Sequence, residues 1–232
     1  MGVSITSLEL EGFDRLPLHT RRCVFWEVDP DGSADVLDDA FSGSLGGCES
    51  EFDKEAWVSG LMLEWGSCSQ IAIEPSTERI VGSAFYAPPN RVPRRKRFPS
   101  GPVAADAVLL TKITVEPGFD AAAPLLLDAV IADVIRRGMR AIETFGYTAT
   151  GDELAGDLVT LLLGGGVAGN VCAECILPTE FLLESGFEVV SADQYLPRLR
   201  LDLAGDLGWK QQVEHALSKL VIAESVVLQG SC

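Results

Sequence analysis

The feature that most constrains the fold of this chain is a strand, a helix and a second strand in direct succession. Residues 108–115 (VLLTKITV) form an apolar, β-branched run that is typical of a buried strand. Residues 121–137 follow with an apolar stripe at helical spacing, made of Leu127, Val130, Ile131 and Val134. Residues 141–145 (AIETF) then predict another strand. Such a unit predicts a right-handed parallel crossover, with the helix packed on the sheet.

The segments on either side predict more strands and helices around this unit. Strands are expected at residues 4–10, 70–73, 80–86, 187–190 and 199–203. Helices are expected at residues 14–22, 52–65 and 178–183, with a last amphipathic helix from Asp206. Residues 23–26 either continue the first helix or form a strand. The chain of 232 residues is 47% hydrophobic, which suits one core. We therefore predict an α+β fold with a twisted mixed sheet flanked by helices, in a single domain over residues 1–232.

The apolar content does not predict a membrane protein. The longest uncharged stretch, residues 158–173, is shorter than the ~20 residues of a spanning helix and contains three consecutive glycines. The first residues lack the basic and apolar regions of a secretion signal. We expect no membrane association and a cytoplasmic location. The final apolar helix can either cover the sheet or pair with a second copy in a homodimer.

The charge of the chain excludes some partners and favours others. Acidic residues number 34 and basic residues 18, for a net charge of −16. A coat on nucleic acid or on an anionic membrane needs the opposite sign. Five of the 18 basic residues nevertheless lie between Arg91 and Arg97. This run is either a docking loop for an acidic partner or a solvated hairpin tip.

The six cysteines are irregularly spaced, which favours reduced thiols in the cytosol. Cys172 and Cys175 form one C-x-x-C pair. A structural zinc site needs four ligands, usually from two such pairs, and the rest of the chain offers His19, His215 and scattered cysteines. We therefore expect small buried or partly exposed thiols and no metal, with a redox or metal role as the alternative.

Two motifs resemble those of a known family. The central strand ends Val115-Glu116-Pro117, and a short helix ends FLLESGF at residues 181–187. Over residues 70–203, these motifs and the order of elements resemble the GNAT family, the Gcn5-related N-acetyltransferases, with their V-x-P and F-Y-E-x-x-G-F motifs. The resemblance implies a sheet splayed between its fourth and fifth strands, with acetyl-CoA as the co-substrate in the splay.

The resemblance also implies the residues that hold acetyl-CoA. The pantetheine would pair with backbone groups of Ile113, Thr114 and Val115. The pyrophosphate would lie on backbone amides of Phe119, Asp120, Ala121, Ala122 and Ala123. The family loop usually reads R/Q-x-x-G-x-G/A, whereas residues 120–125 read DAAAPL. The basic residue and the glycines of the loop are therefore missing, and the loop is degenerate.

The resemblance implies that an acceptor amine attacks the thioester directly, with no metal. The family tyrosine that protonates the leaving thiolate corresponds to Leu182, which cannot donate a proton. Replacement acids are Cys175, Ser185 and Tyr195, and the base candidates are Glu143 and Glu116. The more common role of such carboxylates is that of a solvated group or an ion-pair member. The acidic residues 31–50 favour a cationic acceptor. The predicted function is an N-acetyltransferase acting on an amine, and the alternative is a degenerate GNAT-fold binding or regulatory module without catalysis.

Overall fold

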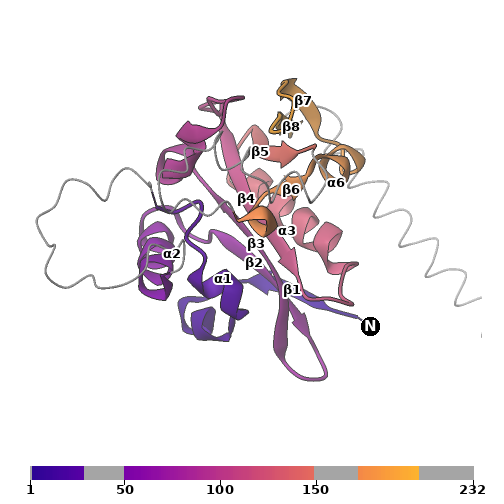
Figure 1. Cartoon of the computed structure of the whole chain (residues 1–232). Coiled ribbons are helices and arrows are strands. Elements are labelled where there is room, and N and C mark those ends of the chain that lie inside the picture. Colours follow the sequence, from indigo (N-terminus) through magenta and orange to yellow (C-terminus); the bar gives the residue numbers. More distant parts are fainter. Residues whose placement is uncertain (1, 29–49, 149–171, 204–232) are drawn as a thin grey trace, which may run out of the picture.

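The computed structural model describes residues 2–28, 50–148 and 172–203 (Figure 1). Within them, eight strands form one mixed sheet in the order β1-β2-β3-β4-β5-β8-β7, with β6 added to β5. The strands are β1 (Ser4–Ser7), β2 (Ser69–Glu74), β3 (Arg79–Ala87), β4 (Ala107–Val115), β5 (Ala141–Tyr147), β6 (Leu177–Pro178), β7 (Glu188–Ser191) and β8 (Arg198–Asp202). The predicted α+β class and mixed sheet are confirmed.

Strand pairing follows the chain order in the first half of the sheet. β1 to β4 pair as antiparallel neighbours, and β4 pairs in parallel with β5. The connection between β4 and β5 is α3 (Ala122–Arg136), so the predicted crossover is confirmed. β5 then pairs antiparallel with β8, which pairs with β7.

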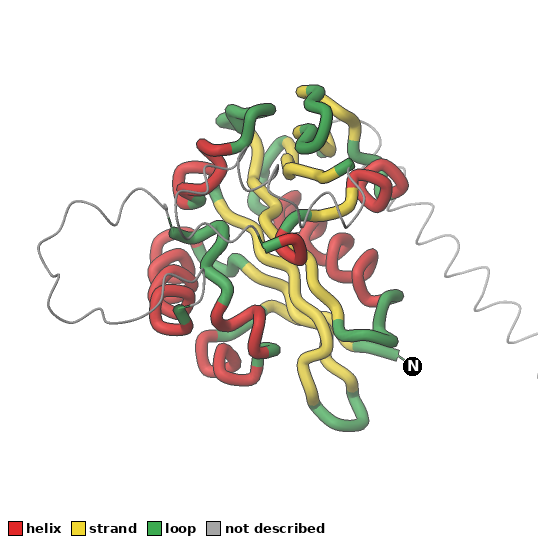
Figure 2. Tube along the Cα trace, in the orientation of Figure 1, coloured by secondary structure: helices red, strands yellow, loops and turns green. Residues whose placement is uncertain are grey.

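Helices cover both faces of the sheet (Figure 2). α3 buries Leu126, Val130 and Val134 in one core, together with Ala84, Tyr86 and Leu110 of the sheet. The other core holds Phe85 and Leu109 together with Phe13, Val58 and Leu61 from the N-terminal part of the chain. Because neighbouring strand residues point to opposite faces, β3 and β4 supply both cores.

The N-terminal part of this second layer contains α1 (Leu18–Arg22), α2 (Glu51–Trp65) and a short 3-10 helix, η1 (Leu10–Arg15). The Ser50 hydroxyl caps α2 by accepting the Asp53 amide at 3.2 Å. Gly66, at φ 95°, ends that helix.

Residues 14–28 differ from their prediction. The expected continuous helix over residues 14–22 is interrupted at Pro17, which lacks an amide donor and restricts its neighbours. Residues 23–26 neither continue the helix nor form a strand of the sheet, and they instead lead into a turn. Their side chains are buried there, which explains the apolar run.

Two predictions cannot be compared with the structure. Most of the acidic stretch at residues 31–50 and the final helix from Asp206 lie outside the described residues. In the described residues, no helix has the length and apolar character that crossing a membrane requires.

Candidate functional site

The strands β4 and β5 separate in the middle of the sheet. They pair at three positions, Ala107 with Ala141, Val108 with Ile142 and Leu109 with Glu143. Beyond this point β4 continues along β3 as far as Val115, whereas β5 pairs with β6 at Gly146 and Tyr147. The predicted splay between the fourth and fifth strands is therefore present in the sheet (Figure 1).

A β-bulge in β4 lies where the strands separate. Phe85 is opposite Lys112 and Tyr86 is opposite Leu110, so Thr111 is the extra residue. The Thr111 hydroxyl donates to the Phe85 carbonyl at 3.0 Å, which stabilises the bulge. Since a bulge bends and twists its strand, it directs the second half of β4 away from β5.

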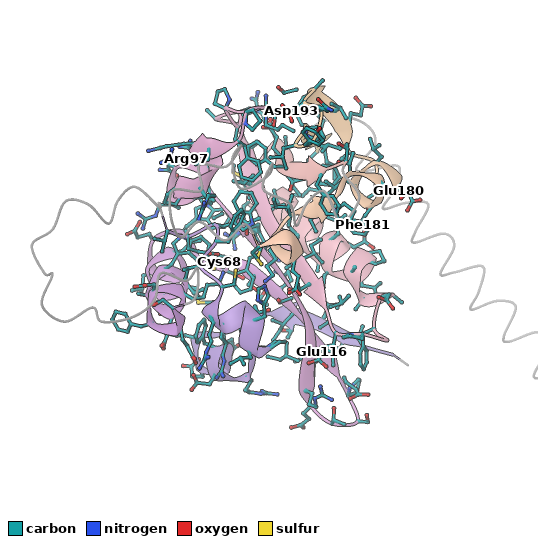
Figure 3. The ribbon with its side chains drawn as sticks, in the orientation of Figure 1. Cys68, Arg97, Glu116, Glu180, Phe181 and Asp193 are labelled. Atoms are coloured by element: carbon teal, nitrogen blue, oxygen red, sulfur yellow. The ribbon has the colours of Figure 1, made fainter. Side chains whose placement is uncertain are left out.

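A cleft of about 550 Å³ opens at this splay. One side is formed by Ile113 and Val115 of β4 and by Asp120, Ala123 and Pro124 at the start of α3. The other side is formed by Leu177 and Pro178 of β6 and by Phe181, Glu184 and Ser185 of α6 (Thr179–Glu184) and its C-terminal end. Figure 3 shows Phe181 on α6 beside α3, whereas Glu180 points outward.

Four of the eight residues predicted to hold acetyl-CoA line this cleft, namely Ile113, Val115, Asp120 and Ala123. The other four, Thr114, Phe119, Ala121 and Ala122, are not part of its lining. Thr114 is paired with Ser83 of β3, and the Ala122 side chain is buried against the core. The structure thus brings the predicted β4 segment and the predicted loop to one cleft.

The loop before α3 uses several of its own amides. The Phe119 amide donates to the Glu116 carbonyl at 3.0 Å, the Ala122 amide to the Phe119 carbonyl at 2.7 Å, and the Ala123 amide to the Asp120 carbonyl at 3.1 Å. Pro124 has no amide hydrogen to offer. Three of the five amides predicted to bind a pyrophosphate are therefore already engaged in this loop.

The charge of the cleft is negative. Asp120 and Glu184 contribute carboxylates to its lining, and no lysine, arginine or histidine is among the described lining residues. A phosphate placed here would meet two like charges, and the cationic partner that usually offsets a phosphate is missing from these residues.

Glu143, the first candidate base, is held in a buried ion-pair network. Its carboxylate pairs with Arg198, accepts from Arg200 at 3.1 Å and accepts the Ala104 amide at 3.1 Å. The side chain is 1% exposed. These contacts join β5 to β8 and to the segment before β4, so the structure gives this carboxylate a stabilising role.

The remaining acid–base candidates lie in different places. Glu116 pairs with Arg79 at 2.5 Å, and the Tyr195 hydroxyl accepts from the Gln194 amide group at 2.9 Å. Leu182, at the position of the family tyrosine, is fully buried. Ser185 lies at the cleft, where its hydroxyl donates to the Phe181 carbonyl at 2.7 Å. Of the three replacement acids, Ser185 is the one that lines the cleft.

Cys175, the third replacement acid, is buried in a cluster of four residues that could bind a metal ion. His19, Cys23, Cys172 and Cys175 place their ligand atoms within 4.8 Å of one another. Hydrogen bonds from the Cys172 and Cys175 thiols lower the pKa of the Cys23 thiol, against the effect of burial. The sequence offered His19 and scattered cysteines as further ligands but did not single out Cys23, which directly follows α1, four residues after His19.

The basic run between β3 and β4 is mostly bound to the rest of the molecule. It forms two 3-10 helices, η3 (Pro89–Arg91) and η4 (Pro93–Arg97). Arg94 is buried, donates to the Phe25 carbonyl at 3.0 Å and lies 4.7 Å from the centre of the Phe25 ring. Arg91 pairs with Glu64 at 2.5 Å, whereas Lys96 is exposed. The expected acidic partner of this run stays a prediction.

Comparison with known proteins gives matches among solved structures alone. No protein-family model matches the chain, and no curated protein matches it. The chain is similar to an N-acetyltransferase from Staphylococcus aureus Mu50, at 12% identity and a TM-score of 0.47, covering 88% of this chain and 99% of that one. It is also similar to YncA, a putative acetyltransferase from Salmonella typhimurium with its cofactor acetyl-CoA, at 12% identity and a TM-score of 0.47, covering 88% and 96%.

A third similar structure is the PaiA N-acetyltransferase from Thermoplasma acidophilum in complex with coenzyme A. Its identity is 10% and its TM-score is 0.45, with 87% of this chain and 99% of that chain covered. The strand order, the α3 crossover and the splay define the present chain, by its own topology, as an α+β protein with a GNAT-like sheet.

Proposed function

We propose that the protein is an N-acetyltransferase that moves an acetyl group from acetyl-CoA to an amine. The observation that carries this proposal is the cleft at the splay, where β4 leaves β5 after Leu109. A pantetheine arm has amides that pair with an extended backbone, and the segment around Ile113 and Val115 offers such an edge to the cleft. The apolar side chains of Leu177 and Phe181 suit its methylene groups.

The proposed reaction is a direct transfer. The acceptor nitrogen attacks the thioester carbonyl, the C–N bond forms, and the C–S bond breaks to release the CoA thiolate. A cationic acceptor first releases one proton to water, which frees the nitrogen lone pair for the attack. The nitrogen then loses a second proton and the thiolate takes one up, so charge and atoms balance with one proton released overall. Holding amine and thioester together supplies much of the rate, so the reaction does not depend on a strong base.

We propose a cationic acceptor, such as a lysine side chain or a polyamine. The net charge of −16 supports this choice because it attracts cations to the surface. Asp38, Asp39 and Glu49 belong to the acidic stretch at residues 31–50 that favours such an acceptor, and they lie outside the described residues.

The second candidate function is a binding or regulatory module without catalysis. The observation that favours it is the chemistry of the loop before α3, where Asp120 stands in place of a basic residue and three amides are already engaged. Such a module would keep the sheet and the cleft but would bind acetyl-CoA weakly or not at all.

Calorimetry with acetyl-CoA and CoA, followed by mass spectrometry of acetylated amines, distinguishes the two functions. We expect binding of both ligands, with acetylation of a lysine peptide or a polyamine. Ala123→Phe should fill the cleft and abolish both signals. Leu125→Phe is the matched control, since Leu125 lies two residues later on α3, is exposed and does not line the cleft.

Two results would contradict the proposal, one for the activity and one for the cleft as the binding site. Absence of binding at millimolar acetyl-CoA would contradict the transferase and support the module. Binding that Ala123→Phe leaves unchanged would show that the ligand does not occupy this cleft.

A further inference from the structure

We propose that His19, Cys23, Cys172 and Cys175 bind one zinc ion in a tetrahedral, structural site. The proposal concerns a different part of the molecule from the cleft lining and does not depend on acetyl transfer. The four residues come from two segments about 150 positions apart, which the fold brings together.

The four ligand atoms lie close enough together to surround a single ion. Zinc binds thiolate sulfur at about 2.3 Å and imidazole nitrogen at about 2.0 Å, so two sulfurs lie roughly 3.8 Å apart and a sulfur and a nitrogen about 3.6 Å apart. Here the Cys23 and Cys175 sulfurs are 3.2 Å apart, which is closer than in that arrangement, so zinc binding would move them slightly apart. The His19 Nε2 atom lies 3.4 Å from the Cys172 sulfur and 3.6 Å from the Cys175 sulfur.

Local backbone structure holds each pair of ligands in place. His19 lies in α1 and Cys23 ends it, with the Cys23 amide donating to the His19 carbonyl at 2.9 Å. Cys172 and Cys175 close a turn in which the Cys175 amide donates to the Cys172 carbonyl at 2.9 Å. The Trp26 indole also donates to the Cys175 carbonyl at 2.8 Å, which ties the second pair to the segment that follows the first.

The charge around the cluster also fits a zinc ion. Three thiolates, a neutral histidine and Zn²⁺ sum to a charge of −1. Lys112, on the β4 bulge, is 3% exposed, and its Nζ atom has no hydrogen-bond partner in the described structure. It lies close enough for its charge to act on Cys23, Cys172 and Cys175. A buried ammonium without a partner is costly, whereas a zinc site of charge −1 compensates it.

Two other arrangements of these residues are weaker explanations. A disulfide between Cys23 and Cys175 needs about 2.05 Å between the sulfurs, well below 3.2 Å, and leaves His19 and Cys172 without a role. An ion pair of His19 with Glu174, at 3.4 Å, does not explain three converging cysteines, and the Glu174 side chain is 73% exposed. A zinc site uses all four residues.

The position of the site suggests what the metal does. Cys175 ends η5 (Ala173–Cys175), and β6 begins two residues later with Leu177, which lines the cleft. A zinc ion would therefore tie the wall formed by β6 and α6 to α1 and hold it against β4. The ion would stabilise the cleft without contacting the acyl donor.

Metal analysis of the purified full chain tests the proposal. Under reducing, chelator-free conditions we expect one zinc per chain, released when the thiols are blocked. Cobalt added to the metal-free chain should give the thiolate charge-transfer and tetrahedral d–d bands. His19→Ala and Cys172→Ser should lose the zinc, whereas His19→Cys should keep it and shift the cobalt spectrum towards that of four thiolates.

Two further variants make the assignment specific. Cys68→Ala is the matched control, because Cys68 is a buried cysteine outside the cluster whose pKa burial raises to about 12. It should keep one zinc per chain. Lys112→Met should weaken zinc binding by roughly tenfold in competition with a chelator, because the positive charge that offsets the net charge of the site is lost, and Lys112→Arg should largely restore it.

Several results would overturn the proposal. The first is a wild-type chain that holds no zinc and gives no cobalt bands. The second is a Cys23–Cys175 disulfide found by peptide mapping of the chain purified under reducing conditions. The third is equal zinc loss in Cys68→Ala and Cys172→Ser. The cobalt titration of the wild-type chain does not depend on the folding of any variant, and none of these results bears on acetyl-CoA binding.

Discussion

Gly146 lets β5 pack closely against β6 and α6, because it has no Cβ atom. A Cβ atom at this position would lie 2.6 Å from the Thr179 hydroxyl oxygen, 2.9 Å from a Leu199 methyl group and 3.2 Å from a Leu182 methyl group. Gly146 has no positive φ, so the requirement is space and not backbone conformation. The glycine therefore permits the close approach that forms one side of the splay.

Gly146→Ala should lower the free energy of unfolding by about 1–3 kcal/mol, the usual cost of overpacking a core. Urea denaturation measures it. Gly60→Ala in α2 is the control: no heavy atom lies within 4 Å of the added Cβ, and alanine should raise stability by up to ~1 kcal/mol in a helix. Equal stability of wild type and Gly146→Ala would show that this contact is looser than described.

At the scale of elements, the start of α3 is where this chain departs most from the motifs it resembles. The loop from Phe119 to Pro124 keeps the position of an anion site, at a helix N-terminus beside the cleft. Its amides are partly engaged, and Asp120 adds a negative charge. The loop therefore has the position of a phosphate site, but few of its amides are free and its charged side chain is negative.

Asp120→Asn should therefore tighten CoA binding. Removing one like charge near a pyrophosphate in partly solvated surroundings should make the free energy of CoA binding more favourable by roughly 1 kcal/mol, or about fivefold in Kd. Calorimetry measures this Kd. Asp128→Asn provides the control, because Asp128 is exposed on the same helix and does not line the cleft. An equal gain from both variants would indicate a general charge effect and not a phosphate at the loop.

The proposed zinc site makes a second prediction for an element. Without the metal, η5 and β6 lose their link to α1, and the short pairing of Leu177 with Gly146 should open more often. Removing zinc from the wild-type chain should speed hydrogen exchange in residues 172–178 by about tenfold, roughly 1.4 kcal/mol of local stability. The pairing of β2 with β3 is the internal control and should not change.

At the scale of the whole molecule, charge governs how the two proposed substrates approach. The net charge of −16 should attract a cationic acceptor and repel the anionic CoA. Salt shortens the range of both effects, from a Debye length of about 30 Å at 0.01 M to about 8 Å at 0.15 M.

Raising the salt concentration over this range should raise the KM for a polyamine several-fold and lower the Kd for CoA. Steady-state kinetics and calorimetry measure the two quantities. A neutral aromatic amine is the control acceptor, and its KM should change little. A salt response of the same sign for polyamine and CoA would contradict the electrostatic argument.

Local patterns were sufficient to predict most elements of the described fold. β4 and α3 lie within one residue of their predicted bounds, because a long run of apolar or periodic residues determines one strand or helix locally. Residues 23–26 were ambiguous because four apolar residues suit a helix, a strand or a buried turn equally. The ion-pair partners of Glu143 could not be named from the sequence, because Arg198 and Arg200 lie on a strand that is distant in sequence.

The sequence by itself determined the order of the elements, the parallel crossover and the two motifs that point to the cleft. These follow from hydrophobic periodicity and turn residues, which act between near neighbours. The tertiary structure alone decided which distant residues meet. His19 and Cys23 reach Cys172 and Cys175 because the fold brings the end of α1 and the η5 segment together in one core. Such contacts depend on the register and topology of the whole sheet, and residue spacing alone does not specify them.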